Sequence, residues 1–258
     1  MRRIVIVPRN GYVNRLQALT SAQILAREID AELELAWLAQ PSAPSAVDSV
    51  LDVAGFPGRL AGSDFSLPGG TQFNDVPVGI TPIGESSLLV AGGLAGEQVL
   101  MPELRRELAG QARTLVIVAG GKFWLRGDAV LSSTGAREFR LERQRAYKRL
   151  RLNAFIEEQA RKTIAQLPES FIGLHLRFGD RNWQAPSKRR LRKTMHYLHA
   201  HACRDVYVAG DDAQQIREWS TWLKNHEWRV WTNSNDASSA LSPRTPEALV
   251  DWRVLGAA

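Results

Sequence analysis

The stretch of this sequence with the most reactive side chains is residues 171–180, FIGLHLRFGD. Its alternation places His175 and Arg177 on one face of a predicted strand and apolar residues on the other. Open α/β sheets bind ligands at the carboxyl ends of such strands. A guanidinium at Arg177, with Gly179 allowing close backbone approach and Asp180 orienting a neighbour, suits phosphate groups in geometry and charge. The segment therefore predicts an anion site, and in particular a diphosphate site.

A second candidate site is the loop GYVNRLQAL, residues 11–19, between a predicted strand and a predicted helix. Backbone amides and the positive end of a helix can receive an anion or a sugar hydroxyl there. With its single glycine, Gly11, the loop lacks the dinucleotide-binding fingerprint. Two interpretations stay open: Asn14 and Arg15 contact a ligand, or Asn14 only caps the helix while Arg15 is solvated.

Three aspartates near the C-terminal end of the chain have both structural and functional interpretations. Asp211 and Asp212 follow a predicted strand at residues 205–209 and begin a helix. Carboxylates are favourable at that end of a helix whether or not they touch a ligand, so capping and nucleoside contact are both possible. Asp251 lies among apolar residues of the predicted last helix, where exposure on the outer face would explain it.

The order of strand and helix patterns predicts the fold class. Strands at residues 4–7 and 33–37 flank a helical pattern, which indicates a βαβ crossover. Further strands are expected at residues 115–119, 171–177, 205–209 and 229–231, and helices at 46–53, 153–167, from 211 and from 245. Residues 55–96 give no clear period. We expect an α/β protein of two Rossmann-like halves, residues 1–135 and 136–258.

Composition indicates a globular protein of 258 residues with a net charge of +6. No apolar run approaches the roughly 18 residues of a membrane span, and the N-terminus lacks the features of a signal peptide. Cys203 is the single cysteine, so no internal disulfide is expected and a cytoplasmic location is favoured. No His, Asp or Cys spacing matches a metal site, and we expect no metal cofactor.

Positive charge is concentrated at residues 137–151 and 181–193. The first segment mixes acidic residues among the basic ones and is typical of a solvated helix face. The second follows HLRFGD and fits either a loop that holds an acidic substrate or a mobile basic loop. A nucleic-acid-binding protein is one alternative function, although aromatic residues are not interleaved with these segments as single-strand binding requires.

Four segments resemble the fucosyltransferases. The opening, GYVNRLQALTSAQILAREIDAELELAW, resembles bacterial proteins related to the nodulation fucosyltransferase, with their GxGNRL loop. HLRFGD resembles the HxRxGD segment shared by the alpha-1,2-, alpha-1,6- and protein O-fucosyltransferase superfamily. VYVAGDD resembles its third signature, and EALVDWRVLG resembles its penultimate helix. The order and spacing of the four agree, and residues 40–140 are unmatched.

This resemblance implies a glycosyltransferase B (GT-B) fold with the active site in a cleft between its two halves. It implies metal-independent, inverting transfer of fucose or a related sugar from a GDP-sugar such as GDP-fucose, without a cofactor, to a glycan or peptide acceptor. The catalytic residue it implies is Arg177, which would bind the diphosphate and stabilise the leaving GDP. The donor-binding residues it implies are Gly11, Asn14, Arg15, His175, Asp180, Asp211, Asp212 and Asp251.

Two departures from the superfamily pattern define a further alternative. Tyr12 and Val13 replace the usual second glycine of the first loop. The sequence also ends at Ala258, before the strand and serine-rich loop that the superfamily normally carries. The chain is thus expected to be either a truncated transferase or a non-catalytic nucleotide- or glycan-binding relative with an incomplete donor site.

Overall fold

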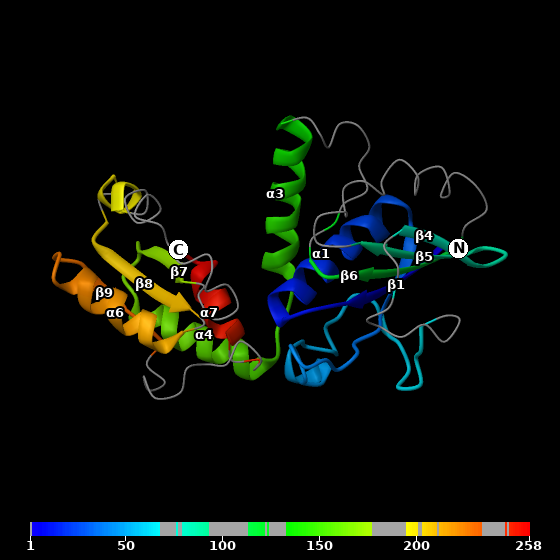
Figure 1. Ribbon diagram of the computed structural model, residues 1–258, viewed down its shortest axis with the longest axis horizontal. Coiled ribbons are helices and arrows are strands. Elements are labelled where there is room, and N and C mark those ends of the chain that lie inside the picture. Colours follow the sequence, from blue (N-terminus) through cyan, green and yellow to red (C-terminus); the bar gives the residue numbers. More distant parts are fainter. Residues whose placement is uncertain are drawn as a thin grey trace. The chain divides into compact units, whose positions relative to one another are not determined.

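The computed structural model describes residues 2–67, 76, 79–92, 113–121, 123, 133–176, 195–200, 203–210, 212–233, 246 and 248–258. Internal contacts divide the chain into two units, Met1–Leu152 and Asn153–Ala258. Each unit has its own sheet (Figure 1). Arg177, Asp180, Asp211 and the basic segment 181–193 lie outside the described residues.

The first unit is built on a six-stranded sheet in the order β3-β2-β1-β6-β5-β4. Its strands are β1 (Arg2–Pro8), β2 (Ala31–Leu35), β3 (Arg59–Leu60), β4 (Gly79–Gly84), β5 (Ser87–Gly92) and β6 (Thr114–Ala119). Neighbouring strands are parallel except for β4, which pairs antiparallel with β5. The predicted βαβ crossover at the start of the chain is confirmed. The β4–β5 hairpin lies within residues 55–96, where no clear hydrophobic period predicts an element.

Helix α1 (Tyr12–Glu28) packs on β1 and β2. Ala18, Ala22 and Leu25 are buried, as their spacing predicts. The prediction that Asn14 caps this helix is wrong, because Gly11 is the N-cap residue and Asn14 lies inside the first turn. The helix predicted at residues 46–53 is only a short 3-10 turn, η1 (Val47–Ser49).

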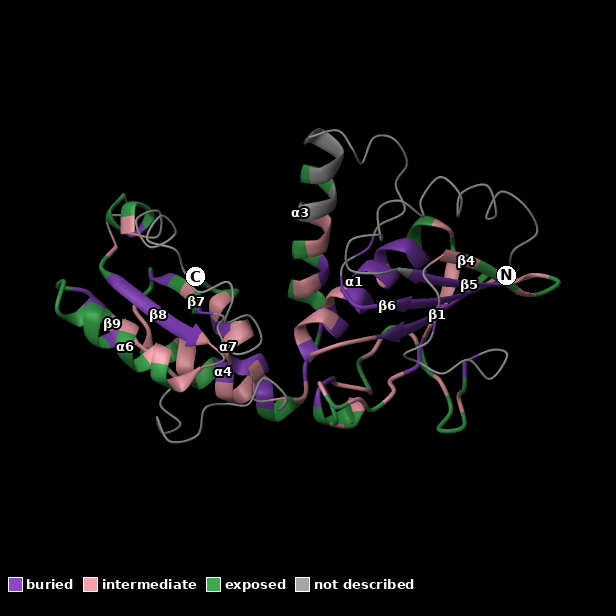
Figure 2. Cartoon of the chain, in the orientation of Figure 1, coloured by how far each residue is buried: buried purple, intermediate pink, exposed green. Residues whose placement is uncertain are grey.

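The opposite face of this sheet is covered by the segments that follow β3. Val5 and Val7 of β1 point to this face and belong to a cluster of buried side chains. The cluster also contains Ala36, Leu67, Val76, Leu89, Ala91, Val116 and Val118. Since both faces are covered, the central strands are apolar and buried over residues 4–7 of β1 and 115–119 of β6, as parallel strands usually are, and Figure 2 shows this burial.

The second unit has a three-stranded parallel sheet in the order β7-β8-β9. Its elements are α4 (Ala154–Gln166), β7 (Ile172–Leu176), β8 (Asp205–Gly210), α6 (Ala213–Lys224), β9 (Arg229–Trp231) and α7 (Ala248–Leu255). Val206 and Val208 pack with Leu223 of α6 in a core cluster. Helix α7 contacts β7, β8 and α4. The strands and helices predicted for this half are present, with ends shifted by a few residues.

The division between the units falls after Leu152, whereas the expected boundary at residues 135 and 136 lies in the first turn of helix α3 (Ser133–Arg149). Helix α3 groups with the first unit because it packs against α1. Within the described residues, no helix has the length and apolar character needed to cross a membrane.

Candidate functional site

The carboxyl ends of β1 and β6 are joined by hydrogen bonds just before α1. The backbone N–H of Arg9 donates to the Ala119 carbonyl at 2.8 Å, and Asn10 Nδ2 donates to the Gly120 carbonyl at 3.2 Å. Asn10 has a φ of 66°, in the left-handed region that asparagine tolerates better than most residues. A Cβ on Gly120 would lie 2.5 Å from Asn10 Nδ2. A larger residue at position 120 would therefore displace the Asn10 amide from this position.

Gln40, after β2, ties a third segment to the same edge. Its Oε1 accepts from the Asn10 backbone N–H at 3.1 Å, and its Nε2 donates to the Pro8 carbonyl at 3.3 Å. The backbone that leads into α1 is therefore fixed from both neighbouring strands. Such an edge, at the carboxyl ends of parallel strands, is the usual ligand-binding edge of an α/β sheet.

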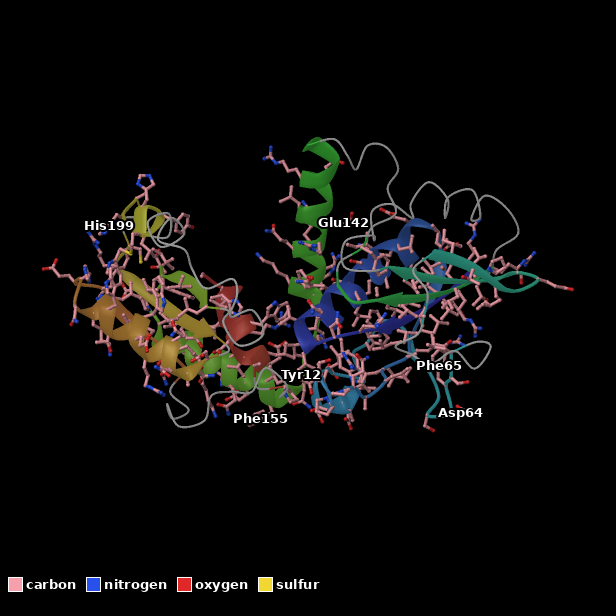
Figure 3. The ribbon with its side chains drawn as sticks, viewed as in Figure 1. Tyr12, Asp64, Phe65, Glu142, Phe155 and His199 are labelled. Atoms are coloured by element: carbon pink, nitrogen blue, oxygen red, sulfur yellow. The ribbon has the colours of Figure 1, made fainter. Side chains whose placement is uncertain are left out.

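Tyr12, labelled in Figure 3, is the first residue of α1. Its side chain is buried, and its Oη accepts from the Ser45 backbone N–H at 3.1 Å. Trp37 Nε1 donates to the Ser45 carbonyl at 3.0 Å. Tyr12 is therefore part of the packing beneath this loop.

Arg15 is 0% exposed, so the interpretation in which it is solvated is wrong. Its Nε donates to the Asn10 carbonyl at 3.0 Å, and its guanidinium carbon lies 4.7 Å from the centroid of the Trp37 ring. Nη1 and Nη2 are buried and have no hydrogen-bond partner among the described residues. Burial lowers the pKa of Arg15 from 12.5 to about 10, so the side chain is still charged at neutral pH.

The amino end of α1 therefore combines three sources of positive potential. Gly11 supplies no side-chain cap, and the first turn contains no acidic residue. The first N–H groups of the helix and its dipole favour an anion, and the buried Arg15 charge adds to both. Asn14 lies half-buried in the same turn. Gly11, Asn14 and Arg15 thus share one helix terminus, where an anion would offset the buried charge.

In the second unit, His175 lies near the carboxyl end of β7 and is exposed, while Ile172 and Leu176 are buried. The predicted alternation of this strand is thus correct within the described residues. Gly173 shares the His175 face, and a Cβ there would lie 2.9 Å from Leu255 Cδ2 of α7. Helix α7 therefore covers the part of β7 next to His175.

Asp251 anchors α7 to the sheet. Its Oδ1 accepts from Tyr207 Oη at 2.5 Å, and the Tyr207 side chain is 0% exposed. Burial raises the pKa of Asp251, and hydrogen bonds from Tyr207 and Asn233 oppose that rise. Burial also raises the pKa of Tyr207, and the neighbouring carboxylate adds to the effect. The interpretation of Asp251 as an exposed outer-face residue is wrong, because it is held between helix and strand.

Asp212 is the N-cap of α6, and its Oδ1 accepts from the Gln215 backbone N–H at 3.0 Å. The structural interpretation of this residue is therefore correct, and its second carboxylate oxygen keeps acceptor capacity. His175 is the next-to-last residue of β7, and Asp212 lies two residues after the end of β8. The two strand ends are neighbours, since Leu176 of β7 pairs with Gly210 of β8. Among the described residues, no group of three His, Cys, Asp or Glu side chains is placed to hold a metal ion.

Four residues around these sites were not singled out from the sequence: Asn10, Trp37, Gln40 and Tyr207. Asn10 had a usable signal, because asparagine before glycine after a strand is a turn former. Trp37 and Gln40 had none, since their partners are distant in sequence. Tyr207 lies in an apolar strand. A buried tyrosine hydroxyl needs a hydrogen-bond partner, and in the structure that partner is Asp251.

Comparison with solved structures relates this fold to known enzymes. Fucosyltransferase NodZ from Bradyrhizobium has a TM-score of 0.52 at 16% identity, covering 97% of this chain and 85% of its own. NodZ alpha-1,6-fucosyltransferase soaked with GDP-fucose has a TM-score of 0.55 at 16% identity, covering 97% and 84%. A variant of Arabidopsis thaliana FUT1 in complex with GDP has a TM-score of 0.60 at 13% identity, covering 98% of this chain and 64% of its own. The chain has the fucosyltransferase fold.

This fucosyltransferase fold confirms the predicted α/β class, and the similarity extends over nearly the whole chain. No protein-family model and no curated protein matches the sequence.

Proposed function

We propose that this protein transfers fucose or a related sugar from a GDP-sugar to a carbohydrate or peptide acceptor. The observation that carries the proposal is the buried Arg15 guanidinium, whose Nη atoms lack partners among the described residues, at the amino end of α1. Solved structures with this fold were obtained with GDP or GDP-fucose. A diphosphate would supply the negative charge that this terminus lacks.

Arg15 acts on the donor mainly through the electrostatic field of its charged guanidinium. Because the side chain is fully buried, its charge is poorly screened by water. The Asn10 carbonyl that it holds fixes the backbone before the helix, and the N–H groups of the first turn receive the diphosphate or a sugar hydroxyl. Gly11 allows the donor to approach the backbone, and Asn14 supplies an amide for the sugar.

The second unit supplies the nucleotide-binding groups in this proposal. Arg177 follows β7 directly in the sequence and contacts the diphosphate, and His175 contacts phosphate, ribose or sugar. Asp180 orients the loop, and Asp211 or Asp212 lies near the nucleoside. Asp251, bonded to Tyr207, acts indirectly by holding α7 on the sheet.

The transfer step is a direct displacement with inversion and needs no metal. The acceptor hydroxyl oxygen bonds to the anomeric carbon as the bond from that carbon to the β-phosphate oxygen breaks. The hydroxyl proton passes to water, and GDP leaves with the bonding electrons. Arg177 stabilises the charge that develops on the diphosphate, which is where electrostatic stabilisation lowers the barrier most. With a free cysteine, the chain suits the reducing cytoplasm, where we place the activity.

Titration calorimetry with GDP tests the donor site. Arg177→Ala is expected to weaken GDP binding by about 2 kcal/mol, or roughly 30-fold, because a charge-assisted phosphate contact is lost. Arg161→Ala is the matched control, since Arg161 is exposed on α4 and paired with Glu158. Absence of GDP binding at millimolar concentration, or an equal loss in the control, would refute the proposal.

Turnover separates a transferase from a binding protein. The released GDP is measured while the protein is incubated with GDP-fucose, with and without oligosaccharide acceptors. GDP binding with no release of GDP from any GDP-sugar would favour a non-catalytic relative, and release that depends on Arg177 supports the transferase.

A further inference from the structure

Helix α3 presents two different faces along its length. The inner face packs on α1, where Ala146 contacts Ile24 and Glu142 pairs with Arg27 at 3.3 Å. Figure 3 shows Glu142 on this helix. Tyr147 also faces α1, since its hydroxyl is hydrogen-bonded to Thr20. Glu142 and Tyr147 of α3 therefore take part in the packing of α3 on α1 within the first unit.

The outer face carries unpaired positive charge. Arg137, Arg145, Lys148 and Arg149 are exposed, and none has an ion-pair partner among the described residues. We call these four residues the α3 stripe. At about 100° per residue they lie within roughly 120° of the helix circumference, and Arg137 and Lys148 are about 16 Å apart along the axis. Figure 2 shows exposed residues along α3.

The spacing within the α3 stripe favours an extended anionic partner over a single small anion. Glu138 is exposed on the same side, but four cations outnumber it. Like charges on neighbouring helical turns destabilise the helix slightly, and a bound polyanion would remove that repulsion. Gln144 is exposed between Arg137 and Lys148 and offers both a donor and an acceptor to hydroxyl groups.

We propose that the α3 stripe binds an anionic oligosaccharide, one with carboxylate or sulfate groups on successive sugars. Resting on the proposed function, this oligosaccharide is the acceptor. A nucleic acid fits less well, because no aromatic ring is exposed among the described side chains of α3 for bases to stack on. Binding by exposed cations alone must weaken as salt is added.

The test compares binding of defined probes to the full chain by titration calorimetry at low and physiological salt. The probes are a galacturonic acid hexamer, a heparin hexasaccharide, a neutral galactose hexamer and a single-stranded DNA oligonucleotide of equal charge. The variant Arg137→Gln/Arg145→Gln/Lys148→Gln is expected to weaken binding of the preferred anionic hexamer at least tenfold. The two anionic probes distinguish carboxylate from sulfate recognition.

The matched control is Arg59→Gln/Arg161→Gln/Lys224→Gln, which removes the same charge from exposed residues of β3, α4 and α6. It is expected to leave the affinity for the anionic hexamers within about twofold of wild type. The proposal is overturned if the control loses as much as the stripe variant or if neither anionic hexamer binds at millimolar concentration. It is also overturned if the galactose hexamer binds equally well, or if DNA binds more tightly at physiological salt.

GDP affinity, measured on the same samples, separates this proposal from the donor assignment. Loss of hexamer binding with unchanged GDP binding is the result expected of the stripe variant. Hexamer binding by a chain that binds no GDP would retain the stripe as a glycan-binding surface and would overturn its assignment as the acceptor site of a transferase.

Discussion

Replacing Arg15 by methionine tests whether its buried charge serves a ligand or the fold. Methionine keeps much of the length and apolar volume of the side chain and removes its charge. Two quantities are predicted for Arg15→Met: the free energy of unfolding without ligand, and the increase in that free energy on adding GDP. A functional role and a purely structural role give opposite results for this pair of measurements.

The magnitudes follow from the contacts of Arg15. A pKa lowered from 12.5 to about 10 corresponds to a penalty of about 3 kcal/mol on the charged side chain. The bond from Nε to the Asn10 carbonyl offsets about 1.5–3 kcal/mol of this, and the contact with the Trp37 ring about 0.5–2 kcal/mol. These opposing contributions largely cancel, so Arg15→Met is expected to change the unfolding free energy without ligand by no more than about 2 kcal/mol.

The effect on ligand binding is expected to be larger. A charge roughly 6 Å from a phosphate, at an effective dielectric constant near 20, contributes about 2–3 kcal/mol. At 100 times the wild-type Kd, GDP raises the unfolding free energy of the wild type by about 2.7 kcal/mol. With Kd about 30-fold higher, the same GDP concentration raises that of Arg15→Met by under about 1 kcal/mol.

Urea unfolding with and without GDP measures both quantities. Arg27→Met is the matched control, because Arg27 is on the same helix, exposed, and paired with Glu142. Its GDP-dependent increase in unfolding free energy is expected to equal that of the wild type. A loss of more than about 3 kcal/mol without ligand, combined with an unchanged GDP-dependent increase, would contradict a ligand-binding role and show that Arg15 serves only to hold Asn10 and Trp37.

Three further predictions concern the second unit. Tyr207→Phe is expected to lower the unfolding free energy, measured by urea unfolding, by about 2 kcal/mol, because Asp251 loses a buried hydrogen-bond donor. The double variant Tyr207→Phe/Asp251→Leu should recover most of the lost free energy, and no recovery would contradict the pairing. Because the folded pKa of Asp251 is raised, its contribution to stability is full below the unfolded pKa and is lost as pH rises through the folded value. The stability of Asp251→Asn relative to wild type should therefore increase from pH 4 to pH 7. An equal stability difference at the two pH values would contradict the raised pKa. Gly210→Ala places a Cβ 2.5 Å from the Leu176 carbonyl and should cost about 1–3 kcal/mol in thermal unfolding, whereas Gly256→Ala, with 3.4 Å to its nearest atom, should cost less.

The fold was predictable where local pattern and tertiary environment agree. Strand β1 and helix α1 have regular apolar patterns. Both are found as predicted because β1 lies within the sheet and α1 packs its apolar face on that sheet. The β4–β5 hairpin was not predictable in the same way. Its strand β4 lies at the edge of the sheet and contains Pro82, and a proline within a run argues against a strand when only the sequence is considered. Its position is set by pairing with β5, which itself pairs with the distant β6.

The sequence predicted which residues form the candidate site, but it did not predict how far their side chains are buried. The sequence analysis singled out Arg15 and Asp251. For each residue, however, the alternative to a functional role assumed that the side chain is exposed to solvent. Their burial depends on Trp37 and Tyr207, which lie far from them in sequence. Residue spacing reports which side chains share a face, and it does not report which distant segment covers that face.

Arg15 and Asp251 together show how a buried ionisable residue can be assigned to function or to packing. Asp251 has its charge met within the second unit, because Tyr207 donates to it and Asn233 adds a second hydrogen bond. Arg15 has one bond and one ring contact, and its two terminal nitrogens are unmatched among the described residues. A buried charge that the protein itself satisfies is explained by the fold, whereas one left unsatisfied at the ligand-binding edge of a sheet is best explained by a ligand. This difference, which burial alone does not reveal, is why we assign the anion to α1 and treat α7 as a support.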